Sequence, residues 1–561
     1  MVKLKILPEG RSLEIPQGSN LLLALASKGF IIDGVCGGKG RCGKCKVKIS
    51  PSPELTLKDK VFLSSDEQDN GWRLACQHKS SVDAEIELKE ISFVPKKLNF
   101  SIIPSNVSDA VIWDIDSFDK VPISVLQDFS WLKGEKVKFI TGFDGLPRII
   151  VKTSEPVWGL ALDLGTISLG GVLYNLENVK ENYKFSVINP QITLGADVLT
   201  RLTYVMERGK AGFKLLRKLL HKGVKDLIGK LLGKIKKTST IARIAIVANP
   251  VITYFFLGLN PLGLLDVNPT IFLNSPLITN AAELGLTYLP AYTSCVILPP
   301  CASFLGGDVL AGILSTKIYK RKSYSLLVDL GANAEIVLGN EERLLSVSAA
   351  AGPAFEGWAL EVGTTACEGS IYNVKLTQQG EVICKTLGNI KPRSICGAGV
   401  ISLVAELLKN KLINKDGRFS IPSSSIWNKC FRENKFFITP EVYLSQKDLR
   451  AIQLAKGAIR GGIEILLKER NVTPAEIKRI YLVGNLGASL KLDELICLGM
   501  LPESISGEVI YSESSALEGA ILCSQSNSSL DEVKKIIKSL DYISLSTRSD
   551  FIKTFVQNLN F

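Results

Sequence analysis

The chain has 561 residues, of which 46% are hydrophobic and 22% charged, and its formal net charge is +12. This composition excludes a disordered chain or a multi-span membrane protein, and a length well beyond the ~250–300 residues at which single cores stop growing predicts several domains. No apolar run approaches the ~20 residues that a membrane-spanning helix needs, and the first residues lack the pattern of a signal peptide, so we expect a cytoplasmic protein.

Residues 1–94 are predicted to form one small domain. Alternating apolar and polar residues indicate strands at 2–6 and 11–15 and within "KCKVKIS" and "AEIELKE". The stretch "SNLLLALASKG" between them indicates a short helix, for which Ser19 is the expected N-cap. The order of these elements, together with the cysteines described next, resembles the 2Fe-2S ferredoxins, and this resemblance implies a β-grasp fold.

A glycine-rich loop in this domain carries a pattern of cysteines. Cys36, Cys42 and Cys45 follow the spacing C-x5-C-x2-C, and Cys76 stands alone thirty residues further on. A 2Fe-2S cluster needs four thiolates, two on each iron, and the glycines allow backbone N–H groups to approach the sulfurs. Zinc is the alternative, although zinc ligands usually come as two short pairs. With four thiols available, His78 is expected at the surface rather than as a ligand.

The periodic pattern weakens from residue 95 to about residue 156, where prolines recur. Strand-like fragments such as "VKFITG" and "RIIVK" remain. We interpret residues 95–156 as a linker and a small middle domain that lets the cluster domain move.

Two similar turns follow in the large carboxy-terminal part. In "WGLALDLGTISLGGVLYNL" an apolar strand leads into Asp163, Gly165 and Thr166, and in "SYSLLVDLGANAEIVLGN" another leads into Asp329 and Gly331. The two aspartates are 166 residues apart. Glycine lets a hairpin approach phosphate oxygens, and aspartate holds Mg²⁺ or its water ligands. The repetition predicts duplicated subdomains that face each other across a nucleotide cleft.

Three further features are less specific. "IYLVGNLGASL" places Gly484 and Gly487 after a strand at 481–483, which suits either an adenosine site or a plain strand-to-helix turn. Residues 208–237 contain eleven Lys and Arg against one acidic residue, and they form either the solvated face of amphipathic helices or a docking surface for an acidic partner. Cys396 is expected to be a buried packing thiol rather than a nucleophile.

Taken together, these motifs resemble the ATP-dependent reductive activators of corrinoid proteins. The carboxy-terminal part of that family belongs to the superfamily of acetate and sugar kinases, Hsc70 and actin, known as ASKHA. The resemblance runs through most of residues 1–94 and 158–525 and includes "INPQITLGADVLTRL", "AAAGPAFEGWALEVG" and "KPRSICGAGVISLVAELL". It implies a ferredoxin domain at 1–94, a linker and middle domain at 95–156, a two-subdomain ASKHA domain at 157–530 and a carboxy-terminal extension at 531–561.

The resemblance also implies a function. A low-potential electron would pass from a 2Fe-2S cluster to cob(II)alamin in a partner protein and regenerate cob(I)alamin, with ATP and Mg²⁺ supplying the driving force. An upstream low-potential electron donor and a homodimer are further implied, whereas neither nucleic acid nor a membrane is expected as a partner. The resemblance assigns adenosine binding to Gly484 and Gly487, and it assigns the positioning of Mg²⁺ and water to Asp329 and Glu335. The residues to which it assigns phosphate binding are Asp163, Gly165, Thr166, Gly331 and Asn333.

The sequence departs from the family pattern at several of these turns. Ile167 and Ala332 stand where the family usually has threonine, Asn485 replaces a glycine, and Ala248-Asn249-Pro250-Val251-Ile252 replaces Gly-Asn-Thr-Thr-Met. Each lost neutral hydrogen bond to phosphate is worth about 0.5–1.5 kcal/mol. The alternative function is therefore a nucleotide-independent ferredoxin-like carrier or docking protein with a degenerate ATPase fold.

Overall fold

The structure of the protein is a computed structural model. The described residues are 1–89, 109–112, 120–131, 136–236, 240–266, 269, 271–331, 333–357 and 360–561. Residues 95–108, 113–119 and 132–135 of the expected linker and middle domain lie outside the described residues, as do Ala332 in the second Asp-x-Gly turn and Lys237 at the end of the basic segment.

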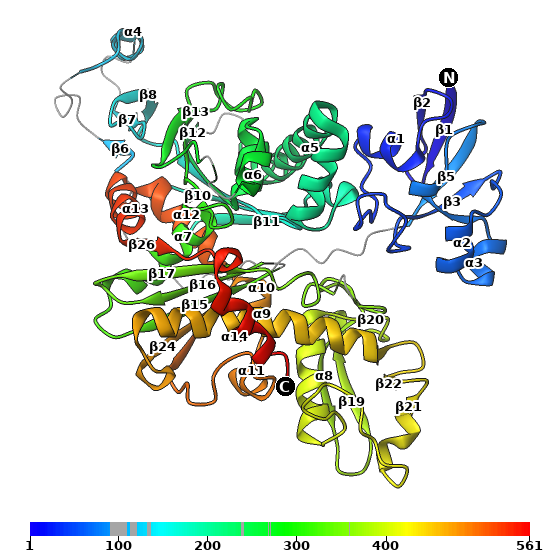
Figure 1. Ribbon diagram of the computed structural model, residues 1–561. Helices are drawn as coiled ribbons and strands as arrows, with labels where there is room; N and C mark the ends of the chain where they lie inside the picture. Colours follow the sequence, from blue (N-terminus) through cyan, green and yellow to red (C-terminus); the bar gives the residue numbers. More distant parts are fainter. Residues whose placement is uncertain are drawn as a thin grey trace.

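The amino-terminal domain is built on a five-stranded sheet in the order β2-β1-β5-β3-β4 (Figure 1). Strands β1 and β5 run parallel and the other neighbours antiparallel. Alternate side chains of β1 are buried in the domain's own core, as the sequence pattern predicts. The elements are β1 Val2–Leu7, β2 Arg11–Ile15, α1 Leu21–Ser27, β3 Lys46–Ser50, α2 Leu57–Phe62, α3 Ser65–Asp69, β4 Trp72–Leu74 and β5 Ala84–Leu88.

Two details of this domain differ from the sequence prediction. The N-cap of α1 is Asn20, whose side chain accepts the Leu23 N–H at 3.2 Å, while the Ser19 hydroxyl donates to the Pro16 carbonyl instead. His78 is buried rather than at the surface, and its Nε2 lies 2.7 Å from Asp59 Oδ2. A local sequence pattern shows neither the distant partner of His78 nor which of two adjacent residues caps the helix.

A three-stranded sheet, β6-β7-β8, follows the amino-terminal domain in sequence, but Figure 1 shows it on the opposite side of the molecule from that domain. The two strand-like fragments predicted from sequence are confirmed as β7 and β8. Arg243 anchors this sheet from the next domain, because its buried guanidinium donates to the Thr141 and Gly142 carbonyls and pairs with Asp109 at 2.6 Å. The elements are β6 Val111–Ile112, α4 Ile123–Trp131, β7 Val137–Thr141 and β8 Pro147–Lys152.

Two six-stranded sheets form the large carboxy-terminal part and repeat one topology. The first has the order β11-β10-β9-β12-β14-β13 and the second the order β25-β24-β15-β16-β17-β26. In each sheet three antiparallel strands are followed by two parallel ones, which confirms the predicted duplication. The strands are β9 Val157–Leu164, β10 Ser168–Asn175, β11 Asn182–Ile188, β12 Thr240–Ala248, β13 Leu277–Asn280 and β14 Ser294–Ile297, then β15 Ser325–Leu330, β16 Ala334–Gly339, β17 Leu344–Ala349, β24 Arg479–Val483, β25 Glu508–Ser512 and β26 Leu540–Tyr542.

Helices α7 (Gly307–Thr316) and α12 (Ser515–Gln525) pack together between the two sheets. They share one core with residues of both sheets, so the two lobes are joined by a common apolar centre. The predicted architecture is confirmed: a small amino-terminal domain, a small middle sheet and a carboxy-terminal part made of two duplicated α/β lobes. Other helices are α5 Val198–Leu232, α6 Pro250–Leu257, α8 Gly397–Lys409, α9 Gln446–Arg470, α10 Gly484–Gly487, α11 Leu492–Cys497, α13 Asn527–Ser539 and α14 Ser549–Gln557.

Two small sheets extend the second lobe, and its last segment completes the main sheet. The expected domain boundary at residue 530 falls inside α13, and β26 pairs in parallel with β17, so residues 531–561 do not form a separate extension. The small sheets contain β18 Ser370–Leu376, β19 Val382–Thr386 and β20 Ser394–Ile395, and β21 Phe431–Arg432, β22 Lys435–Phe437 and β23 Tyr443–Ser445.

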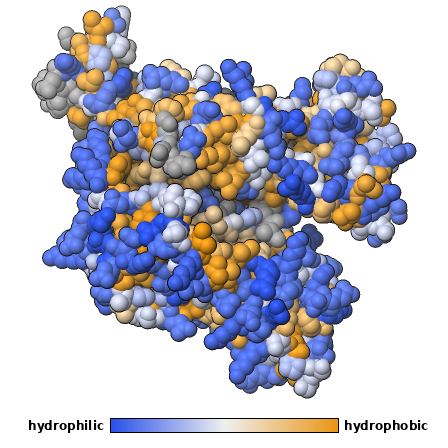
Figure 2. Space-filling model, viewed as in Figure 1, coloured by the Kyte–Doolittle hydropathy of each residue, from blue (hydrophilic) through white to orange (hydrophobic). Residues whose placement is uncertain are grey.

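The basic segment lies on α5, which is interrupted at Gly209 and covers the first sheet. Its apolar residues are buried and most of its Lys and Arg residues are exposed, which confirms an amphipathic helix with a solvated basic face. Most of the surface in Figure 2 is likewise hydrophilic. Within the described residues, no helix combines the length and the apolar character that a membrane crossing requires.

Candidate functional site

The four cysteines of the amino-terminal domain lie together as two pairs. The Sγ atoms of Cys36 and Cys42 are 3.4 Å apart, and the thiols of Cys45 and Cys76 interact with each other. Hydrogen bonding from Cys42 lowers the pKa of Cys36 to about 5, and hydrogen bonding from Cys45 lowers the pKa of Cys76 to about 7. One thiol of each pair is therefore favoured as the thiolate, which is the form that binds metal.

Backbone conformation and a buried polar network hold these thiols in place. The four loop glycines have positive φ, which other residues adopt at a cost, and they are Gly37, Gly38, Gly40 and Gly43. Gln77 Nε2 lies 3.2 Å from the Cys76 sulfur, and Asn20 donates to the Cys76 carbonyl at 2.8 Å. Asp59 accepts the Leu74 N–H at 2.8 Å, which fixes the strand that leads to Cys76.

This donor set fits a 2Fe-2S cluster. Each iron of such a cluster takes two protein thiolates, so a two-plus-two arrangement of cysteines is what the cluster requires. Four-coordinate zinc would need three or four ligands around one position. Across the part of the chain that the structure describes, no group of three or more His, Cys, Asp or Glu side chains is arranged to hold a single metal ion.

The first phosphate turn connects β9 to β10. Asp163 is the penultimate residue of β9, and a Cβ at Gly165 would lie 2.6 Å from the Ser168 carbonyl oxygen, so only glycine allows this tight connection. The Thr166 hydroxyl accepts a hydrogen bond of 3.0 Å from Asn249 Nδ2. Asn249 also caps α6 by accepting the Ile252 N–H, so one side chain ties the helix to the turn.

Buried polar side chains hold the carbonyl side of the same turn. Asn189 Nδ2 donates to the Gly165 carbonyl at 2.9 Å, and Arg201 Nη2 donates to the Thr166 carbonyl at 2.5 Å. The Arg201 guanidinium is fully buried, and this burial lowers its pKa to about 9. Both residues belong to the stretch "INPQITLGADVLTRL", to which the sequence analysis gave no individual roles.

The second phosphate turn joins β15 to β16. Asp329 and Glu335 are opposite each other in this hairpin, and the Gly331 N–H donates to the Asn333 carbonyl at 3.0 Å. Gly484, at the end of the neighbouring strand β24, lies against this hairpin, since a Cβ there would be 2.4 Å from Asp329 Oδ1. The third glycine element therefore lies beside the second turn, and its role in binding adenosine stays a prediction.

Asp308, in the first turn of α7, is a carboxylate that sequence reasoning missed. Burial first, and then the charges of Asp163 and Asp329, raise its pKa to about 7. Burial also raises the pKa of Glu335 well above its usual value, with Asp308 and Asp329 adding to the effect. Acidic groups of both lobes thus act on one another where the lobes meet, which is the arrangement that a cation stabilises.

The burial of one further glycine and one further cysteine, Gly487 and Cys396, explains why these residues stand at their positions. Gly487 is buried at the end of α10, where it packs on the backbone of β24. Cys396 precedes α8 and is almost fully buried, and burial raises its pKa. A buried thiol with a raised pKa is a poor nucleophile, in agreement with the expected packing role.

Comparison with protein families divides the chain into three matched parts. Residues 4–81 match the 2Fe-2S iron-sulfur cluster binding domain. Residues 158–321 match the RACo middle region, and residues 323–561 match the C-terminal domain of RACo, the ASKHA domain. The boundary between the last two falls between the two repeated sheets.

Two curated proteins and one solved structure are similar over much of the chain. Corrinoid activation enzyme RamQ of Eubacterium limosum is 27% identical over 98% of this chain and 97% of its own length. The Co(II) methylated amine-specific corrinoid protein reductase of Methanosarcina barkeri is 26% identical over 72% of this chain and 77% of its own length. A structure described as a reductive activator for corrinoid, iron-sulfur protein superposes with a TM-score of 0.72 and 26% identity, covering 100% of this chain and 98% of the other.

Proposed function

The chain belongs to the family of reductive activators of corrinoid proteins, and on this basis we propose that it passes one low-potential electron to cob(II)alamin in a partner protein. The observation that carries the proposal is the union, in one chain, of a paired four-cysteine loop with two duplicated sheets whose carboxylates interact with one another. The first suits an electron carrier and the second suits ATP.

Four thiols would hold the cluster, namely Cys36, Cys42, Cys45 and Cys76. A 2Fe-2S cluster supplies one-electron chemistry, and the surrounding protein sets its potential through hydrogen bonds to sulfur and through burial. In this chain the Gln77 amide is within reach of the Cys76 sulfur, and Cys45 and Cys76 are buried while Cys36 and Cys42 keep some contact with solvent. The exposed pair is the side from which an electron would leave.

ATP would bind between the two lobes. The backbone N–H groups and hydroxyl of the first turn, at Gly165 and Thr166, would contact phosphate, with Gly331 and Asn333 doing so from the second turn. Gly484 and Gly487 would line the adenosine side. Reduction of cob(II)alamin is uphill, and each ~100 mV of opposing potential costs about 2.3 kcal/mol per electron, so coupling to ATP gives the transfer its direction.

Mg²⁺ would be held between the lobes mainly by the phosphates of ATP and by its own water ligands, which the nearby carboxylates would contact, since no three described carboxylates are arranged to hold one ion directly. Asp163 comes from the first lobe, Asp329 and Glu335 come from the second, and Asp308 comes from the helix between them. Carboxylates are the protein ligands that Mg²⁺ prefers, and it usually keeps several water ligands. Asp329 and Glu335 would position the cation and the attacking water.

One paired assay tests the function. The protein is purified anaerobically, its cluster is verified by visible absorbance and electron-spin resonance, and cob(II)alamin reduction in a corrinoid protein is followed with and without Mg-ATP. We expect ATP hydrolysis that the corrinoid protein stimulates, and a reduction that requires ATP. Equal reduction without ATP would instead establish the nucleotide-independent carrier.

The remaining partners follow from the same function. An upstream low-potential donor must reload the protein after each transfer, and a homodimer is proposed through the carboxy-terminal part. Cluster reduction by candidate carriers tests the first, and sedimentation of the holoprotein tests the second.

A further inference from the structure

One short segment touches both the cysteine loop and the first phosphate turn. It runs from Asn189 to Arg201, comprising the single-turn helix Pro190–Leu194 and the start of α5, and we call it the bridging segment. The amino-terminal domain, which Figure 1 shows beside α5, contacts one side of this segment, and the first phosphate turn contacts the other.

The bridging segment contacts the cysteine loop through backbone groups. The Ile32 N–H donates to the Thr193 hydroxyl at 3.1 Å, and the Ala196 N–H donates to the Val35 carbonyl at 3.2 Å. A Cβ at Gly34 would lie only 1.9 Å from the Thr193 carbonyl oxygen. Gly34 is therefore glycine because the two backbones approach each other so closely, and no larger residue fits the docked arrangement.

The other side of the bridging segment holds the phosphate turn. The Asn189 N–H donates to the Ile167 carbonyl at 2.8 Å, and its side chain donates to the Gly165 carbonyl. The Arg201 guanidinium connects three points, since it donates to the carbonyls of Thr166 and Gly195 and to Gln191 Oε1 at 2.9 Å. A planar guanidinium with fixed donors holds such an arrangement more rigidly than lysine would.

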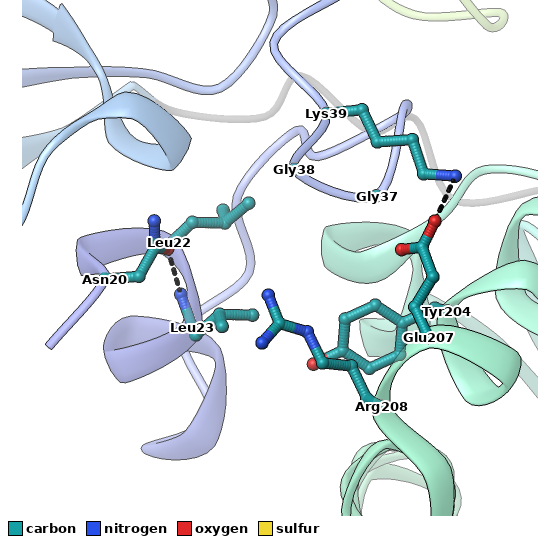
Figure 3. A pocket seen from close by; sticks show the side chains of 9 residues that line it. All are labelled: Asn20, Leu22, Leu23, Gly37, Gly38, Lys39, Tyr204, Glu207 and Arg208. Carbon is teal, nitrogen blue, oxygen red and sulfur yellow. Dashed lines mark hydrogen bonds and ion pairs between the residues drawn. The ribbon is translucent and has the colours of Figure 1, made fainter.

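Contacts farther along α5 are peripheral by comparison. Lys39 pairs with Glu207 at 2.9 Å beside a small pocket, and Figure 3 shows Tyr204 and Arg208 of α5 facing Leu23 of the cluster domain across it. Exposed ion pairs of this kind contribute roughly 0–1 kcal/mol. The buried contacts of the bridging segment therefore fix how the cluster domain docks.

We propose that the bridging segment couples nucleotide binding to docking of the cluster domain, with Asn189 and Arg201 as positioning residues. This inference rests on the nucleotide site of the proposed function. The segment binds the carbonyl side of the turn and leaves its N–H side for phosphate. A nucleotide that orders the turn also orders the segment, so the two events favour each other.

The element with two states is the cluster domain, docked or released. It has its own sheet and core, so it can move as a unit. Coupling is reciprocal: the factor by which nucleotide favours docking is also the factor by which docking favours nucleotide binding, so a change that releases the cluster domain weakens nucleotide binding by up to that factor. A mutation in the ferredoxin domain therefore has a measurable effect in the distant cleft.

Gly34→Ala provides the first test, in the full-length holoprotein. We expect the variant to keep the visible spectrum of a 2Fe-2S cluster but to bind a non-hydrolysable ATP analogue with Mg²⁺ about 2- to 12-fold more weakly by calorimetry, the factor that one neutral hydrogen bond is worth. Lys5→Ala, in the same domain but away from the interface, is the matched control and should bind like wild type. An intact cluster with unchanged affinity in Gly34→Ala would overturn the proposal.

Thr193→Val provides the second test, by hydrogen exchange with and without the same analogue. In wild type the analogue should slow exchange of the Ile32 and Ala196 amides, and in Thr193→Val this slowing should shrink. Lys218→Met also loses a contact across the interface, to the Ser27 carbonyl, but it leaves the bridging segment intact and should retain the effect.

The proposal fails if saturating analogue leaves both amides unchanged in wild type, or if no analogue binds. Neither readout uses cob(II)alamin. A protein that reduces its corrinoid partner with ATP but shows no exchange response therefore refutes the coupling alone, whereas an exchange response without corrinoid reduction refutes the electron acceptor alone.

Discussion

Neutralising Asp308 should stabilise the nucleotide-free protein above neutral pH. The folded pKa is about 7, against 3.8 for an ordinary aspartate, because burial and the charges of Asp163 and Asp329 oppose ionisation. An acid whose pKa is raised by folding contributes its stability below the unfolded pKa and loses it as the pH rises through the folded value. The loss therefore develops between about pH 4 and pH 7 and stays constant above.

The shift sets the size of the effect. At 1.36 kcal/mol per pKa unit the full difference is about 4 kcal/mol, and the neighbouring carboxylates share part of it, so we expect about 2–4 kcal/mol. Asp308→Asn removes the charge and keeps the shape. In the absence of Mg²⁺ the variant should unfold several degrees above wild type at pH 8 and at the same temperature as wild type near pH 4.

The same variant should bind Mg²⁺ more weakly, because a nearby carboxylate is lost, and calorimetry in buffers of different ionisation enthalpy should show fewer protons released on binding. Asp531→Asn, which changes an exposed carboxylate paired with Lys534, is the control and should show neither effect. Equal unfolding temperatures of wild type and Asp308→Asn at pH 8, together with equal Mg²⁺ affinity, would refute the cluster of interacting carboxylates.

Three further predictions concern the two sites. Cys42→Ala should lose the visible chromophore, and a variant with a full 2Fe-2S spectrum would contradict its assignment as a ligand. Asn249→Ala removes the partner of the Thr166 hydroxyl and should weaken binding of the ATP analogue by about 0.5–1.5 kcal/mol. The control Asn260→Ala removes the cap of a helix elsewhere and should leave analogue binding unchanged. Equal losses of affinity in the two variants would refute the role of Asn249. Ile167→Thr should restore a hydroxyl donor and tighten analogue binding several-fold by calorimetry, and an unchanged affinity would show that phosphate does not reach this position.

Local patterns predicted much of the fold. Alternation identified the ferredoxin strands, and the repeated strand and Asp-x-Gly pattern identified the duplication, because each depends on residues that are close in sequence. The cysteine spacing identified three of the four thiols. Cys76 lies in a different element, and it was added because a 2Fe-2S cluster requires four thiolates.

Features that depend on distant contacts were missed. The choice of Asn20 over Ser19 as cap depends on which side chain faces the helix, and the burial of His78 depends on Asp59, which lies nineteen positions away. Asp308 follows Gly306 and Gly307 at the start of an apolar helix, which was the available signal, but only the tertiary structure places it near Asp163 and Asp329.

The departures at Ile167, Pro250 and Val251 also look different in the structure. Counted as lost hydroxyl donors, they suggest a degenerate nucleotide site. Yet the Asn249 side chain holds the Thr166 hydroxyl, and Asn189 and Arg201 hold three successive carbonyls of the turn, so its N–H groups are fixed without the missing threonines. Preorganised backbone donors bind phosphate whatever side chains the turn carries. A site of this kind retains nucleotide binding while losing contacts at individual phosphates, which favours an ATP-responsive protein over an inert scaffold.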